Sequence, residues 1–328
     1  MASKFPSDAE VVIVGVGGIV GSMLAYWLTE LGQKNIIGLE KSSVIPSDMG
    51  STAHASDFVY NTTHDKLGNW STAFSRNFYD DNGFFLKKGG LEICRKDDDV
   101  LWEELKRKVA SGKAFGTNVR LISAAEAKEK FPLLDEESIR GAMWDPDAGL
   151  VTPRSQDVVR FAVEHAKEKG ALKTYADTPA TGFEIENGRI TAVKTDKGTI
   201  KTNKVVIASG IWGPLVGEMA GVPIPLMPVE HPLLFFGPLP EAQEAEDFLV
   251  YPLMRDQGNS AYVRDTGKLH GGMLEWGFYE DKEPRLVDAE DIGNPDKTMM
   301  SDSMRYLDLE EVAEPLEKAF ETTPILTE

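Results

Sequence analysis

The sequence has few of the features that direct a chain to an oxidising compartment, a membrane or a nucleic acid. Cys94 is its one cysteine, so no disulfide can form within the chain, which fits a reducing compartment. Lys and Arg number 35 against 53 Asp and Glu, which gives a formal net charge of −18. This excess of negative charge repels a phosphate backbone and an anionic bilayer on average, so we expect no nucleic-acid partner.

Long apolar runs are also missing. The first run, residues 11–20, is interrupted by glycines, is too short to cross a bilayer and lacks the layout of a signal peptide. The sequence therefore predicts no membrane insertion and a cytoplasmic location, with an organelle lumen reached through a cleaved presequence as the alternative. It contains no internal repeat and no low-complexity tract.

What the sequence does have is enough apolar material for a sizeable core. With 328 residues, 41% of them hydrophobic, one large or two modest domains are expected. Residues 11–14 are a β-branched run typical of a buried parallel strand, and apolar residues then recur at helical spacing over residues 19–31. A second strand, residues 36–39, ends at Glu40. This β-turn-α-β unit is typical of the start of a dinucleotide-binding domain.

After residue 40, the expected helices and strands follow one another less regularly. Residues 41–88 are rich in Ser, Thr, Asn and Asp and are expected to be irregular, and a proline-punctuated, strand-like composition begins near residue 221. Periodicity and turn residues predict helices at 97–109, after 152–155 and at 307–320, the last kinked or broken by Pro315, a β-meander at 182–200 and a buried strand at 205–208. We therefore predict an α/β (α+β overall) fold. A Rossmann-like domain at 1–220 carries an irregular or helical insertion near 60–140, and a substrate domain at 221–328 is built on a mostly antiparallel sheet.

The turn after the first strand holds four glycines, Gly15, Gly17, Gly18 and Gly21. Glycines let the chain turn tightly and bring backbone N–H groups near a pyrophosphate, where the helix N-terminus adds partial positive charge. Glu40 is placed to accept hydrogen bonds from an adenosine ribose and would repel a 2′-phosphate. The spacing G-x-G-x-x-G would put its third glycine at Val20, so either the loop carries an extra residue or its register is shifted. A plain strand–helix turn is the alternative to dinucleotide binding.

Four stretches resemble the D-amino-acid-oxidase-type FAD-dependent oxidoreductases, and within them the dimethylglycine oxidase, dimethylglycine dehydrogenase and sarcosine dehydrogenase group. They are the glycine loop through Lys41; Gly50-Ser51-Thr52-Ala53-His54-Ala55, similar to that group's G-S-T-x-H-A segment; residues 147–153 with 188–198; and residues 205–212 continuing to His231. The likeness spans residues 10–235. It implies FAD as the cofactor and a two-part flavoprotein fold.

The resemblance assigns cofactor-binding roles to Gly15, Gly17, Gly18, Ile19, Val20, Gly21, Glu40, Lys41, Ser51, Thr52, Ala53, His54, Ala180 and Gly210. In that group the histidine of the second stretch bonds covalently to the 8α carbon of the flavin, which places this role on His54. An imidazole beside the dimethylbenzene edge of the flavin can attack there as a nucleophile. Alternatively, His54 caps a turn or contacts phosphate, and the FAD is held without a covalent bond.

The resemblance also implies two catalytic residues, His231 and Tyr262. The family's H-Q-Y is His231-Pro232-Leu233 here, and Tyr262 lies in a segment similar to the family's Y-Y-R-E strand. A His/Tyr pair can orient a neutral amine and manage its proton. A loop histidine and a cross-strand aromatic are the alternatives. Three further residues are candidates to hold a substrate carboxylate, although each is more commonly a surface or turn arginine: Arg154, Arg255 and Arg264.

The implied reaction is the oxidation of a small N-methylated or secondary amine such as dimethylglycine or sarcosine, with hydride transfer to the flavin and hydrolysis of the iminium. Oxygen or an electron-transfer partner then reoxidises the flavin. In the family a further glycine-rich segment closes over the flavin; none follows Glu328, so we expect a truncated chain. Two other functions stay open: a non-enzymatic homologue that binds flavin weakly, and a nicotinamide-dependent dehydrogenase, which only the glycine loop and Glu40 support.

Overall fold

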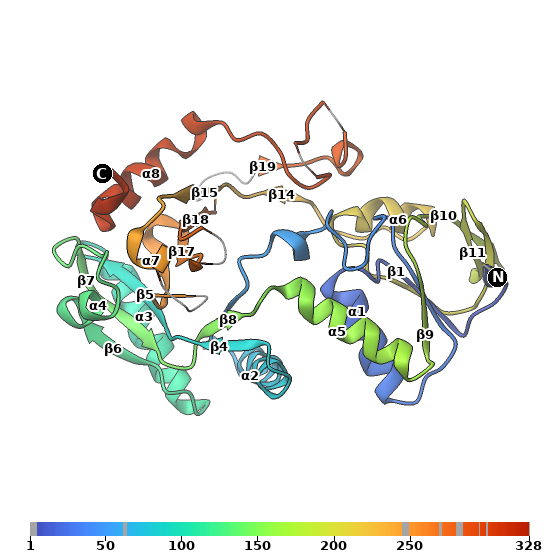
Figure 1. Cartoon of the computed structure of the whole chain (residues 1–328), viewed down its shortest axis with the longest axis horizontal. Coiled ribbons are helices and arrows are strands. Elements are labelled where there is room, and N and C mark those ends of the chain that lie inside the picture. The colour runs from blue at the N-terminus through green and yellow to red at the C-terminus, as the bar shows by residue number, and fades with distance from the viewer. Residues whose placement is uncertain are drawn as a thin grey trace. The chain divides into compact units, whose positions relative to one another are not determined.

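The computed structural model describes residues 5–61, 64–244, 249–268, 271–279, 285–294, 296–299 and 301–327. The chain forms two compact units, each assembled from separate stretches of sequence (Figure 1). Unit 1 comprises residues 1–56, 154–229 and 286–306, and unit 2 comprises residues 57–153, 230–285 and 307–328. Among the described residues, no helix is long and apolar enough to cross a bilayer.

The centre of unit 1 is a four-stranded parallel sheet with the strand order β13-β1-β2-β9. Its strands are β1 (Val11–Val14), β2 (Ile36–Leu39), β9 (Leu172–Tyr175) and β13 (Val205–Ile207). Every residue of β1 and β2 is buried, which explains why both strands are continuous apolar runs rather than alternating ones. The predicted strands at 11–14 and 36–39 are confirmed.

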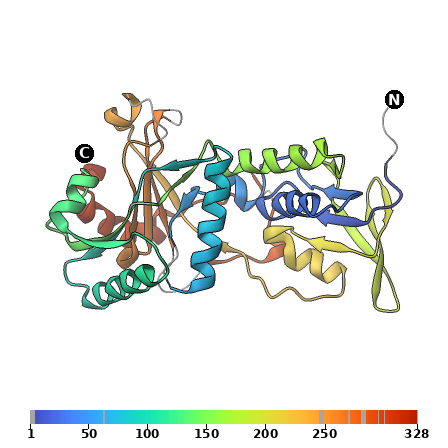
Figure 2. The same cartoon turned by 90° about the horizontal axis from the view of Figure 1, so that it is seen from below.

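Two further layers cover the parallel sheet. On one face, α1 (Ile19–Glu30) and α5 (Ser155–Glu168) lie alongside each other and share an apolar cluster with Val11 and Ile13 (Figures 1 and 2). On the other face, Val12 and Val14 pack against the hairpin sheet β10 (Ala180–Glu186), β11 (Arg189–Thr195) and β12 (Gly198–Lys201) and against α6 (Gly213–Met219). Because successive side chains of a strand point to opposite faces of the sheet, β1 contributes alternate residues to the two layers.

Unit 2 is built on a seven-stranded sheet with the order β15-β18-β17-β16-β5-β7-β6, in which only β16 and β5 run parallel. Its strands are β5 (Gly90–Arg95), β6 (Arg120–Ser123), β7 (Ile139–Asp145), β15 (Leu233–Phe236), β16 (Leu253–Asp256), β17 (Ala261–Asp265) and β18 (Leu274–Phe278). A small antiparallel sheet comprises β3 (Phe58–Val59), β8 (Gly149–Val151) and β4 (Phe85–Lys87). The mostly antiparallel sheet expected for the substrate domain is confirmed.

The two faces of the large sheet differ in character. One face carries the main core, including Val263, Trp276 and Phe278, against which α4 (Ala124–Lys130), α7 (Pro240–Glu244) and α8 (Ala313–Thr322) contribute side chains. On the opposite face, α3 (Asp99–Ala114) covers the β5–β7–β6 end. Because side chains alternate along a strand, Tyr262 lies on this second face.

The division of the chain differs from the predicted one. Residues 57–153, expected as an insertion in the nucleotide domain, belong to unit 2 because β5 pairs with β16 and thereby joins the sheet of residues 233–278. Residues 286–306, expected in the substrate domain, belong to unit 1. These pairings connect residues far apart in the sequence, and no local sequence pattern predicts them. Short strands β14 (Val229–Glu230) and β19 (Arg285–Leu286) pair with each other near two of the boundaries.

Two local expectations are corrected. The stretch expected to be irregular contains α2 (Lys66–Asp81), whose start is capped by Asp65 as its carboxylate accepts a 2.7 Å hydrogen bond from the Gly68 N–H. Gly, Asn, Ser and Thr are poor helix formers and concealed it. Pro315 neither kinks nor breaks the last helix, since α8 begins at Ala313 and the proline lies in its first turn, where an N–H has no intrahelical partner.

Asp256, at the end of β16, makes the stability of unit 2 depend on pH. It is fully buried, and this burial raises the pKa of its carboxyl to about 6, against the opposing charge of Arg95. Between the unfolded value of 3.8 and about 6, the folded chain retains a proton that the unfolded chain loses, so stability falls as the pH rises through this window.

We expect Asp256→Asn to be more stable than the wild type above pH 6, by up to about 3 kcal/mol, and to lose this advantage near pH 4. Urea denaturation from pH 4 to 8 measures the difference. Asp97→Asn, which changes an exposed carboxylate of the same unit, serves as the control. A difference between Asp256→Asn and the wild type that stays constant with pH would contradict the prediction.

Candidate functional site

The glycine loop joins the end of β1 to the start of α1 and is bonded to the end of β2. Gly15 has a φ of +98°, and the N–H groups of Gly15 and Val16 both donate to the Leu39 carbonyl, at 2.9 and 3.1 Å. Gly21 packs directly against the loop, since a Cβ there would lie 2.1 Å from the Gly15 oxygen. Gly21 therefore takes the role of the third glycine, one position later than the G-x-G-x-x-G spacing from Gly15 requires.

Glu40 is part of the loop's support as well as a candidate ribose ligand. It is 7% exposed, its Oε2 accepts from the Gly17 N–H at 2.8 Å, and its Oε1 accepts from the Ser42 N–H at 3.0 Å. Burial raises the pKa of the Glu40 carboxyl, and the backbone hydrogen bonds oppose this shift. A carboxylate oxygen can accept more than one hydrogen bond, so both oxygens keep capacity for a ribose hydroxyl.

The second predicted stretch lies next to the loop. Ser51–His54 form a short 3-10 helix, η1, and the Thr52 Oγ1 accepts a 3.1 Å hydrogen bond from the Ile19 N–H at the first residue of α1. Val20 follows, with its side chain 66% exposed. The structure thus brings together, within unit 1, the residues predicted on the glycine loop, at Glu40 and over residues 51–54.

His54 is held by contacts on both sides of its backbone and at its ring. The Arg154 Nη2 donates to the carbonyls of Ala53 and Ala55 at 3.2 and 3.0 Å, and the His54 Nε2 lies 3.0 Å from the Ser301 Oγ. Partial burial, and next the Arg154 guanidinium, lower the pKa of His54, while Asp48 acts in the opposite direction. A neutral imidazole retains the lone pair that a nucleophile needs.

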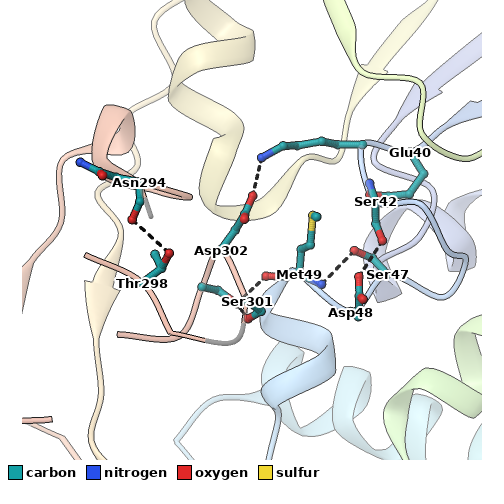
Figure 3. A network of polar contacts seen from close by, with 11 residues as sticks. Glu40, Ser42, Ser47, Asp48, Met49, Asn294, Thr298, Ser301 and Asp302 are labelled. Carbon is teal, nitrogen blue, oxygen red and sulfur yellow. Dashed lines mark hydrogen bonds and ion pairs between the residues drawn. The ribbon is translucent and has the colours of Figure 1, made fainter. Parts of the chain in front are cut away.

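Residues 286–306 complete this region of unit 1 (Figure 3). Lys41 forms a 2.6 Å ion pair with Asp302, and its ammonium lies 4.8 Å from the centre of the Trp212 ring. The Ser303 hydroxyl donates to the Met49 carbonyl, and the Ser42 hydroxyl donates to Asp48 at 2.6 Å. Sequence reasoning missed Ser301, Asp302 and Ser303 because they follow the nucleotide-binding segment by some 250 residues and carry no motif.

The end of β13 also reaches the loop. A Cβ on Gly15 would lie 2.5 Å from the Ala208 oxygen, and Gly210 follows with a φ of +53°. The Ser209 Oγ and the Trp212 Nε1 are buried without a hydrogen-bond partner among the described residues. These orphaned polar atoms, the glycine cradle and the N-terminus of α1 fit a bound dinucleotide. Ala180 instead opens β10 and lies in the apolar cluster beside the hairpin sheet, and among the described residues it makes no polar contact with the loop.

In unit 2, the two predicted catalytic residues share a cluster of rings. The ring of His231 lies 4.6 Å from that of Tyr279, and the Tyr279 ring lies 5.4 Å from that of Tyr262. Phe58 continues the cluster, 5.4 Å from Tyr262 and 6.3 Å from Tyr60. We call Phe58, Tyr60, His231, Tyr262 and Tyr279 the aromatic cluster. Its members Phe58, Tyr60 and Tyr279 were missed because an isolated aromatic residue in a sequence indicates core as readily as a site.

The three candidate arginines have different environments. Arg264 is buried with Glu275 in an ion pair of 2.9 Å, and Arg154 is occupied with the backbone carbonyls beside His54. The Arg255 guanidinium lies 4.1 Å from the centre of the Tyr60 ring and has no hydrogen bond or ion pair among the described residues. It is half-buried on β16, and Tyr262 is its cross-strand neighbour on β17. Arg255 alone of the three is available for a carboxylate.

Comparisons with known proteins agree with this arrangement. Residues 10–326 match the family model "FAD dependent oxidoreductase". Rat mitochondrial dimethylglycine dehydrogenase is 28% identical over 330 residues, covering 98% of this chain and 37% of the rat protein. Human mitochondrial sarcosine dehydrogenase is 28% identical over 288 residues, covering 84% of this chain and 29% of the human protein. The crystal structure of L-proline dehydrogenase from P. horikoshii has a TM-score of 0.79 at 27% identity, covering 98% of this chain and 79% of that one.

A nucleotide-binding parallel sheet and a second unit on an antiparallel sheet are the parts of a two-unit flavoprotein. The chain belongs to the FAD-dependent oxidoreductase family that its match over residues 10–326 defines. It spans about 37% of the length of the rat relative. Membership in an FAD-dependent family favours a flavin over the nicotinamide cofactor that the glycine loop and Glu40 had left open.

Proposed function

We propose that the chain binds FAD in unit 1 and oxidises a small N-methylated or secondary amino acid, similar to dimethylglycine or sarcosine. The observation that carries the substrate class is Arg255, a half-buried guanidinium that has no anionic partner in the part of the chain that the structure describes and lies beside Tyr262 and over Tyr60. A guanidinium fork matches a carboxylate, and in a partly desolvated setting such a charge-assisted pair is strong. The names of the dimethylglycine and sarcosine dehydrogenases among the relatives support the same class.

In unit 1, the glycine loop and the start of α1 receive the diphosphate, Glu40 accepts from the ribose, and Ser209 and Trp212 supply donors. We propose that His54, whose pKa is lowered, forms the covalent bond to the 8α carbon of the flavin. When bound, FAD supplies the two-electron acceptor for oxidation of the carbon–nitrogen bond. Lys41 is neutralised by Asp302, and the Glu40 carboxylate would repel a 2′-phosphate.

In unit 2, Arg255 orients the substrate by its carboxylate, and the aromatic cluster lines the place of the amine. Tyr60 of this cluster is buried, and loss of water around an amine bound beside it would favour the neutral form, which keeps its lone pair for the developing cation. The rings of His231 and Tyr262 each contact the Tyr279 ring. His231 and Tyr262 are the groups proposed to accept the amine's proton.

The test begins with the visible spectrum of the purified protein, followed by acid precipitation. We expect a flavin spectrum that stays with the pellet. Anaerobic addition of sarcosine or dimethylglycine should bleach it, whereas dimethylamine, which lacks a carboxylate, should act far more slowly. A colourless protein that cannot be reconstituted with FAD would contradict the proposal, and equal rates with dimethylamine would remove the role of Arg255.

A further inference from the structure

Val16 and Gly38 face each other between the glycine loop and β2. Val16 is fully buried. A Cβ built on Gly38 would lie 2.8 Å from each of the Cβ, Cγ1 and Cγ2 atoms of Val16. Three carbon contacts this short are well inside van der Waals distance, so in this packing position 38 has room for no side chain. Val16, which lies between two glycines of the loop, thus occupies the space left by the absent side chain of Gly38 in the neighbouring strand.

This contact is the apolar part of a continuous attachment between the loop and β2. The N–H groups of Gly15 and Val16 donate to the Leu39 carbonyl, and the Gly17 N–H donates to Glu40 at 2.8 Å. The apolar contact adjoins these hydrogen bonds, because Val16 lies between Gly15 and Gly17 and Gly38 directly precedes Leu39. A β-branched side chain is stiff at χ1, so once seated it leaves the loop little rotational freedom.

We propose that Val16 and Gly38 form a knob and hollow that hold the glycine loop in the conformation that receives a nucleotide diphosphate. Val16 is a positioning residue, since it acts through the placement of the Gly18 N–H group and of the start of α1, and it is itself fully buried. Nucleotide affinity then depends on the combined volume of residues 16 and 38, because a loop ordered in advance gives up less entropy on binding. The inference rests on the proposed function only for the identity of the nucleotide as FAD.

The experiment uses the full chain carrying His54→Ala, so that FAD binds without a covalent bond. Dissociation constants are measured for FAD, by quenching of flavin fluorescence, and for ADP, by calorimetry. Gly38→Val should raise both constants at least tenfold or so, because the inserted side chain displaces Val16. The exchange Val16→Gly with Gly38→Val restores the total volume and should bring both constants back to within roughly threefold of the parent.

Val16→Ala and its matched control separate positioning from general stability. Val12 is likewise a fully buried valine, on β1, and does not belong to the loop. Both alanine variants should lower the urea midpoint by similar amounts, but only Val16→Ala should weaken ADP and FAD binding, by roughly tenfold. This pair decides the question even if Gly38→Val does not fold.

An exchange variant that binds as poorly as Gly38→Val, or equal constants for Val16→Ala and Val12→Ala, would overturn the inference. A parent that binds ADP but not FAD would contradict the proposed function, and the ADP series would still decide the inference. A parent that binds neither nucleotide overturns both.

Discussion

Arg255→Leu is expected to raise the KM for sarcosine or dimethylglycine by roughly a hundredfold or more, with a smaller effect on kcat. Removing one partner of a desolvated charge pair typically costs about 2–5 kcal/mol, and each 1.4 kcal/mol is a factor of ten in affinity. The effect should fall mainly on KM because a carboxylate remote from the reacting carbon is bound alike in the ground and transition states. Steady-state kinetics at saturating acceptor concentration give both constants.

Two controls make the Arg255 result specific. Arg255→Lys keeps the charge but loses the fork geometry, so its KM should lie between those of the wild type and Arg255→Leu. Arg189→Leu removes an exposed arginine on β11 of unit 1 and should leave both constants unchanged. If Arg255→Leu has the wild-type KM, or weakens dimethylamine turnover by the same factor, the guanidinium does not recognise the carboxylate.

His54→Ala is expected to abolish covalent attachment of the flavin, so that acid precipitation leaves a colourless pellet and a yellow supernatant. The protein should still bind FAD through the glycine loop and Glu40. Mass spectrometry of the denatured protein should show the mass of one FAD on the wild type and none on the variant. His165→Ala is the matched control. His165 lies on α5, where its ring is hydrogen-bonded to Glu30 at 2.7 Å, so its removal should not affect attachment of the flavin.

The pH dependence of attachment follows from the lowered pKa of His54. Only the neutral imidazole is a nucleophile, so the rate of attachment falls when the ring is protonated. With a folded pKa below the usual 6.5, the midpoint of the rate profile should lie at a more acidic pH than that of a free imidazole. A rate that still rises steeply between pH 6.5 and 8 would contradict this assignment, as would a wild-type pellet without colour.

The β-α-β fold of the first 40 residues was predictable because its signals are local. The β-branched run of β1, the helical period of α1 and the acid that ends β2 each lie within a few residues of the feature that they indicate. The unusual spacing of the loop was visible at Gly21, but only the structure shows that Gly21 packs against Gly15. The sequence could not show the compensation at Gly38, since a single glycine in a strand has several meanings.

The remaining structure depends on contacts between distant segments. The pairing of β5 with β16 decides to which unit residues 57–153 belong, and it follows from three-dimensional packing rather than from any turn or periodicity. The same holds for the aromatic cluster, which gathers Phe58 and Tyr60 with residues from 231 to 279. Among the three arginines, only the structure shows that Arg264 and Arg154 are already engaged and that Arg255 is not.

The contacts of residues 286–306 with the loop at 41–54 affect the order of events during biosynthesis. The segment that bears Lys41, Met49 and His54 leaves the ribosome early, yet its partners Ser301, Asp302 and Ser303 are translated about 250 residues later. Strand β13, which lies beside β1, also follows by nearly 200 residues. The nascent chain therefore cannot assemble this whole region of unit 1 until residues 301–303 have also left the ribosome.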